Sequence, residues 1–103
     1  MNKPVKDIVK SFFDGYPIVH YGKGEILLRP DEDLTHVFFL TEGQVVEYDI
    51  STAGNEVVIN AFKPGAFFPM SLAMNRVHND YFFEAATKIS VHEAPADEVV
   101  SFI

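Results

Sequence analysis

The sequence predicts a mainly β domain, a double-stranded β-helix or jelly-roll barrel, with one helix before the barrel and one after it. Two patterns predict this fold. Short runs rich in β-branched and aromatic residues recur about eight times between turns marked by glycine or proline. Apolar residues at helical spacing are found instead near the two ends of the chain.

The length of 103 residues and the hydrophobic content of 48% predict one globular domain, residues 1–103. Within it we expect an N-terminal helix in residues 1–14, a β-roll in residues 18–94 and the start of a C-terminal helix in residues 96–103.

The first helix is predicted from amphipathic periodicity over residues 3–13. Pro4 suits its first turn, where a missing N–H group needs no partner. Gly15 and Pro17 end the helix, because glycine readily forms a left-handed cap and proline cannot continue the hydrogen-bond pattern. The face expected to pack on the roll carries Val5, Ile8, Val9, Phe12 and Phe13.

The strands are predicted from β-branched and aromatic runs between turns. Gly54 lies in a hairpin turn and is expected to adopt a positive φ angle. In the strand after this turn, strict alternation places Val57, Ile59 and Ala61 on one face and Val58 and Asn60 on the other. The expected strands include residues 18–21, 25–28, 36–40, 44–50, 56–62, 81–86 and 89–93.

The second helix is predicted to start within residues 94–97, where Pro95 and Asp97 suit the first helical positions. It is still apolar at Ile103 and has no capping residue there. We therefore expect the protein to continue beyond this point.

The composition argues against several functions. With no cysteine, the chain offers no disulfide, no thiolate nucleophile and no cysteine-ligated metal. The net charge of −7 and the scattered basic residues argue against direct contact with nucleic acid or an anionic membrane. The N-terminus does not resemble a signal peptide and no apolar run is long enough to span a membrane, so a cytoplasmic location is expected.

An ordered set of glycines and aromatic residues resembles the cyclic-nucleotide-binding-like domain, more narrowly the sensor domain of CRP/FNR (catabolite activator) transcription regulators. The resemblance covers residues 15–103. The motif residues are Gly22-x-Gly24-Glu25-Ile26, Gly43 after an apolar strand, Gly54 in a hairpin turn, and Phe62-x-Pro64-Gly65-x-Phe67.

The resemblance implies a β-roll with an N-terminal helix and a following helix pair. It also implies a regulatory, non-enzymatic domain that senses a small-molecule effector and that can form a homodimer. Full-length regulators of this family continue with a long dimerisation helix and a helix-turn-helix domain, through which they contact DNA. This chain would be the effector domain alone.

The cyclic phosphate site departs from the family pattern. Where cyclic-nucleotide binders carry Gly-Glu, this chain has Pro69 and Met70, which offer neither an N–H donor nor a carboxylate in those places. The family's phosphate-binding arginine falls on Asn79 or Asp80, and Arg76 lies nearby in a different register. We therefore expect cyclic AMP and cyclic GMP not to be the effectors. The candidate pocket residues carried over from the family are Ile59, Asn60, Phe68, Pro69, Met70, Ser71, Asn79 and Asp80.

Two alternative functions remain open. One is a cupin-like metal-dependent enzyme on the same fold, which would need clustered histidines and a carboxylate. The histidines are separate in sequence and no catalytic triad or carboxylate pair is apparent, so no enzyme activity, metal or cofactor is expected. His78, in the pocket loop, is the one histidine to test as a haem ligand; the others are His20, His36 and His92.

The other alternative is a ligand-free interaction module whose roll is filled by side chains. Five aromatic residues could fill such a roll. We interpret them as core packing plus a contact face for a following helix rather than as a cofactor site. They are Phe67, Phe68, Tyr81, Phe82 and Phe83.

Overall fold

The computed structural model describes residues 5–69 and 79–102. The helices are α1 (Val5–Phe13) and α3 (Ala96–Phe102). The strands are β1 (Ile18–Tyr21), β2 (Ile26–Leu28), β3 (His36–Glu42), β4 (Val45–Ile50), β5 (Glu56–Phe62), β6 (Phe67–Phe68), β7 (Phe82–Ala85) and β8 (Ile89–Pro95).

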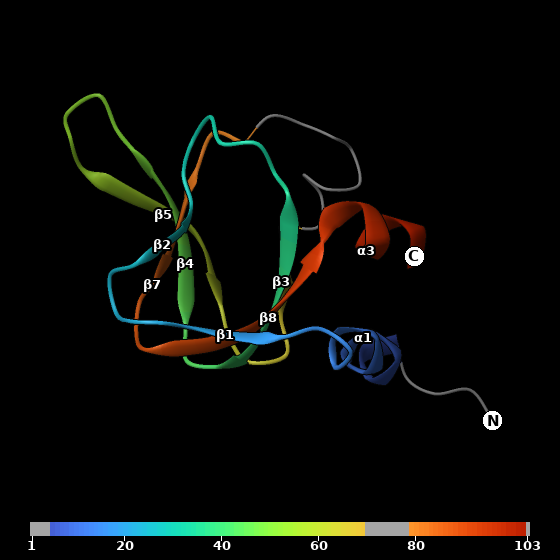
Figure 1. Cartoon of the computed structure of the whole chain (residues 1–103). Coiled ribbons are helices and arrows are strands. Elements are labelled where there is room, and N and C mark those ends of the chain that lie inside the picture. The colour runs from blue at the N-terminus through green and yellow to red at the C-terminus, as the bar shows by residue number, and fades with distance from the viewer. Residues whose placement is uncertain (1–4, 70–78, 103) are drawn as a thin grey trace.

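The strands form two four-stranded antiparallel sheets that face each other across the roll (Figure 1). One sheet has the order β1-β8-β3-β6 and carries both helices on its outer side, and we call it the covered sheet. The other has the order β2-β7-β4-β5 and lies away from the helices, and we call it the open sheet. This arrangement confirms the predicted mainly β roll with flanking helices.

The main core lies between the two sheets, and β3 shows how alternation fills it. Phe38 and Leu40 point into the roll, whereas Val37 and Phe39 point outward beneath the helices. Phe38 and Leu40 share the inner core with Leu28, Val45, Phe68, Phe83, Ala85, Ile89 and Val91.

A second core lies between the covered sheet and the helices. α1 buries Val9 and Phe13 against the outward side chains of β3, as its amphipathic periodicity predicts. Ile8, which was expected on the same face, is instead 42% exposed. The rings of Phe13 and Phe39 stack with centroids 5.4 Å apart. α3 adds Val99 to the same cluster. Within the described residues, no helix is long and apolar enough to cross a membrane.

The C-terminal boundary differs from the prediction by two residues. β8 continues to Pro95, where Ala94 is paired with Val37 and Pro95 with His36. Pro95 is therefore the last residue of a strand rather than an early residue of a helix. It is tolerated because it lies at the end of the β3–β8 ladder. The helix begins at Ala96, whose N–H donates to the carbonyl of Thr35.

The alternation expected along β5 is interrupted by a bulge. Asn60 is paired with Glu47 but Val58 is paired with Tyr48, so Ile59 is an extra residue on β5. Val57, paired with Asp49, therefore shares a face with Asn60 rather than with Ala61, and the predicted division of this strand into two faces is wrong. The positive φ of Gly54, by contrast, is confirmed at 86°.

Candidate functional site

The expected pocket residues are divided between the two sheets and the loop that precedes β7. Phe68 and Pro69 are buried at the end of β6, in the covered sheet. Ile59 and Asn60 lie on β5, the edge strand of the open sheet. Met70, Ser71, Arg76 and His78 lie outside the described residues.

Phe68 lies at the centre of a stack of aromatic rings inside the roll. Its ring centroid is 4.5 Å from that of Phe62 and 5.9 Å from that of Phe83. Phe38 contacts it from the neighbouring strand at 5.8 Å. Packing alone explains why an aromatic residue occupies this position. These contacts agree with the expected core packing of Phe68 and Phe83. Contact between Phe68 and an effector stays a prediction.

Asn79, one of the two residues at the expected arginine position, is buried with 2% of its surface exposed. Its Nδ2 donates to the carbonyl oxygens of Arg29 at 2.9 Å and Tyr81 at 2.8 Å, and its Oδ1 accepts from the Tyr81 N–H at 3.1 Å. Its main-chain oxygen accepts from the Asp31 N–H at 3.0 Å. Asn79 thus holds the start of β7 against the loop after β2. The neighbouring Asp80 is exposed.

Asn60 contacts Glu47, a residue that the sequence analysis missed. Its Nδ2 donates to Oε1 of Glu47 at 2.9 Å, and Glu47 lies opposite it on β4 with only 9% of its surface exposed. The signal was present in the sequence, since Glu47 is a charged residue two positions after the inward-facing Val45.

The outer face of the open sheet carries a second carboxylate contact. The Tyr48 hydroxyl donates to Oε1 of Glu84 at 2.7 Å, and the Tyr48 ring stacks on Phe82 with centroids 5.1 Å apart. Burial, followed by this hydrogen bond, raises the pKa of Tyr48 to about 12 from its ordinary value of 10.0. The pair holds neighbouring strands together, and the raised pKa keeps the Tyr48 hydroxyl neutral at neutral pH.

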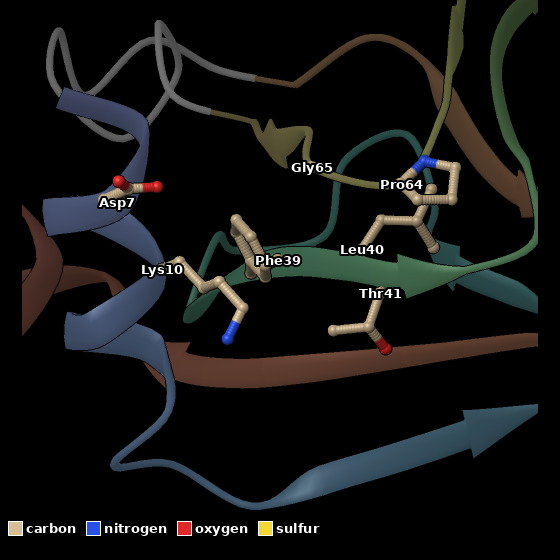
Figure 2. A pocket seen from close by; sticks show the side chains of 7 residues that line it. All are labelled: Asp7, Lys10, Phe39, Leu40, Thr41, Pro64 and Gly65. Atoms are coloured by element: carbon tan, nitrogen blue, oxygen red, sulfur yellow. The ribbon is translucent and has the colours of Figure 1, made fainter. Parts of the chain in front are cut away.

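A surface hollow of about 410 Å³ lies elsewhere, between α1, β3 and the turn before β6. Figure 2 shows Asp7 and Lys10 of α1 on one side and Pro64 and Gly65 on the other, with Phe39 between them. Leu40 and Thr41 complete the lining. Of the predicted pocket residues that the structure describes, none lines this hollow. The ammonium group of Lys10 is already paired with Asp14 at 3.1 Å.

The histidines of the described residues do not converge. His20 bonds to Ser90, His36 to Thr35 and His92 to the carbonyl of Tyr16. No group of three or more histidine, aspartate or glutamate side chains that could hold a metal occurs within residues 5–69 and 79–102. Metal analysis of the purified protein would test the cupin-like alternative directly.

The architecture defines a class of protein: a two-sheet β-roll with a helix leading into it and a helix leading out of it. The sequence profile of the family described as the cyclic nucleotide-binding domain matches residues 18–103. The chain therefore belongs to the cyclic nucleotide-binding domain family, and the family prediction is confirmed. Domains of this family have regulatory roles. A comparison with curated protein sequences found no significant match.

Solved structures with the same fold include proteins with different ligands. One is a regulatory protein from Silicibacter pomeroyi DSS-3, described as a candidate cAMP binder, which is 23% identical in sequence with a TM-score of 0.80. The match covers 93% of this chain and 44% of the Silicibacter chain. The sensor domain of the transcriptional regulator DNR from Pseudomonas aeruginosa is 16% identical with a TM-score of 0.78, covering 97% and 66%.

The regulatory subunit of a cAMP-independent protein kinase A from Trypanosoma cruzi, bound to guanosine, is 16% identical with a TM-score of 0.71. The match covers 81% of this chain and 29% of that one. At these identities the likeness establishes the fold alone. The chain spans less than half the length of the Silicibacter protein.

Proposed function

We propose that this chain is a non-catalytic effector-sensing domain of a CRP/FNR-type transcription regulator whose cyclic phosphate site is degenerate. Its family membership and its structural likeness to the sensor domain of DNR support this proposal. In this proposal DNA is contacted by another part of the full regulator, and the sensor domain passes on the effector signal by a change in its own conformation.

The observation that carries the proposal is the environment of Asn79. A cyclic phosphate needs a cation or several N–H donors, and charge-assisted bonds to arginine are the strongest of these. Asn79 supplies no positive charge, and both of its side-chain polar atoms are engaged by Arg29 and Tyr81 main-chain groups. An anion placed beside it would displace these bonds and gain little.

Two further features support an effector without a phosphate group. Pro69 has no N–H to donate to an anion. The exposed Asp80 adds a carboxylate next to Asn79, which disfavours a phosphate nearby. The guanosine-bound T. cruzi protein has the same fold and a nucleoside, not a cyclic phosphate, as its ligand.

Isothermal titration with cyclic AMP and cyclic GMP tests the proposal. We expect dissociation constants weaker than about 1 mM for both nucleotides. A parallel titration of an established cyclic AMP-binding domain serves as the control for ligand quality. Micromolar binding of either nucleotide to this chain would contradict a degenerate phosphate site. If neither nucleotide binds, mass spectrometry of small molecules that co-purify with the chain would identify the effector.

A further inference from the structure

We propose that Glu47 and Asn60 form the recognition site for an effector group with two adjacent N–H donors, such as the edge of a guanine base or a guanidinium group. This inference rests on the proposed effector-sensing function and specifies the chemistry of its ligand. It concerns the inner face of the open sheet.

The position of Glu47 shows which way it faces. Glu47 is paired with Phe83 on one side and with Asn60 on the other. Directly opposed residues of neighbouring strands share a face of a sheet, and Phe83 belongs to the core inside the roll. Glu47 therefore lies on the inner face, where the burial of a carboxylate is costly unless hydrogen bonds compensate. Packing provides no reason for a carboxylate at this position.

The pair lies where buried residues give way to exposed ones along β4 and β5. Along the inner face of β4 and β5, the first pair is Val45 with Phe62, next to the aromatic stack. The next inner pair is Glu47 with Asn60, and the one beyond it is Asp49 with Val57, of which Val57 is 47% exposed. Counted from the exposed turn of this hairpin, the Glu47–Asn60 pair therefore comes before the phenylalanines of the aromatic stack.

The chemistry of the pair selects donors. An ionised carboxylate only accepts hydrogen bonds, and its two oxygens match two parallel N–H groups in a bidentate arrangement. The amide of Asn60 holds Oε1 at 2.9 Å and so orients the carboxylate. The carboxylate of Asp49 lies two residues along the same strand, which adds to the negative potential and disfavours anions.

Titrations with three probes test the site: guanosine, adenosine and free arginine. Guanine and guanidinium each present two adjacent N–H donors, whereas adenine presents a donor beside an acceptor. We expect guanosine or arginine to bind at least about tenfold more tightly than adenosine, and the better of the two identifies which source of the donor edge is preferred. Equal binding of all three, or binding of none, would overturn the inference.

Variants make the test residue-specific. Glu47→Gln replaces one acceptor oxygen with a donor and is expected to weaken binding of the preferred probe about tenfold or more. The matched control is Glu84→Gln, which makes the same change on the outer face of the same sheet and should leave affinity unchanged. If Glu47→Gln does not fold, Asn60→Ala at an exposed position should still weaken binding by removing the contact that orients the carboxylate. Unchanged affinity in the folded Glu47→Gln variant, or in Asn60→Ala if only that variant folds, would overturn the inference.

The two proposals fail in different ways. If the probes do not depend on Glu47 but another small molecule co-purifies with the domain, the site assignment fails and the sensing function stands. If cyclic AMP binds at micromolar concentration, the degenerate phosphate site fails, whatever the response of Glu47→Gln.

Discussion

The covered sheet and the open sheet are built from the same kinds of strand but differ in what lies against them. In the covered sheet, β3 and β8 are buried on both faces, because the roll core lies on one side and α1 and α3 on the other. In the open sheet, β5 is an edge strand with nearly every residue exposed, and its apolar side chains at Val57, Val58 and Ile59 face solvent.

This difference supports the proposed ligand site on the open sheet. A strand buried on both faces has little freedom to accommodate a ligand, because protein interiors are close-packed. An exposed edge strand with apolar side chains beside a buried carboxylate has the character of a binding surface. The hairpin of β4 and β5 extends away from the body of the roll (Figure 1), so its outer end can be reached from several directions.

The largest difference in stability between the two sheets is expected for alanine variants of two predicted pocket residues, Phe68 and Ile59. Phe68→Ala, which empties the centre of the aromatic stack, is expected to lower the free energy of unfolding by about 3–5 kcal/mol. Ile59→Ala, on the exposed bulge of β5, should change it by only about 0.5 kcal/mol. Urea denaturation measures both. Similar losses for the two variants would mean that the open sheet is packed as tightly as the covered one.

Two glycines with nearly equal φ angles sharpen the comparison. Gly43 has φ 87°, and a Cβ there would meet the Lys88 carbonyl oxygen and lie 2.7 Å from Ile89 Cγ2. Gly43→Ala should therefore cost about 2–5 kcal/mol, from backbone strain plus overpacking. Gly54 has φ 86° but open space around it, so Gly54→Ala should cost only the strain, about 1–2 kcal/mol.

Denaturation midpoints of the two alanine variants, measured side by side, separate strain from steric overlap. Because the φ angles match, the difference between the variants reports the close packing at Gly43. Equal losses would show that the turn at Gly43 can move away from Lys88 and Ile89, and that this end of the roll is less rigid than its contacts indicate.

The smallest expected effect concerns the outer face of the open sheet and depends on pH. Tyr48→Phe removes the bond to Glu84 but keeps the stack on Phe82, and should cost about 1 kcal/mol at pH 8. Folding raises the Tyr48 pKa from 10.0 to about 12, so the neutral hydroxyl is the form that the folded state favours. Its contribution is complete below pH 10 and is lost as the pH rises from 10 through 12.

Urea titrations of the wild type and Tyr48→Phe at pH 8, 9, 10 and 11 would follow this loss. The advantage of the wild type should shrink above pH 10. Tyr21, whose pKa is also raised, by burial and then by its bond to Glu93, is present in both proteins and cancels in the comparison. A constant difference over the whole range would contradict an important role for the Tyr48–Glu84 bond.

The sequence analysis succeeded where a local pattern decides the structure. The helical periodicity before Phe13, the β-branched strands and the positive φ of Gly54 depend on neighbouring residues, and all are found in the structure. The sequence analysis was wrong where pairing with another strand decides the local structure. The bulge at Ile59 is set by pairing with β4, and the extension of β8 to Pro95 is set by pairing with β3.

The candidate site shows the same limit. Position in the motif predicted that Asn79 or Asp80 replaces the phosphate-binding arginine of the family. The bonds of Asn79 to Arg29 and Tyr81 could not be predicted, because they join chain segments brought together by folding. Glu47 was missed because alternation shows that a strand position faces inward, yet it does not show which residue lies opposite. The partner Asn60 is thirteen residues away along the chain.

By itself, the sequence determined the family and the order of the helices and of every strand except β6. It also predicted that the phosphate site lacks its glycine–glutamate pair and its arginine. These depend on residue identity and spacing, which local sterics and periodicity translate directly into structure. Only the tertiary structure decided that Asn79 is engaged within the fold and that Glu47 lies opposite Asn60 on the inner face of the open sheet. Both depend on strand register, which pairing between distant segments sets.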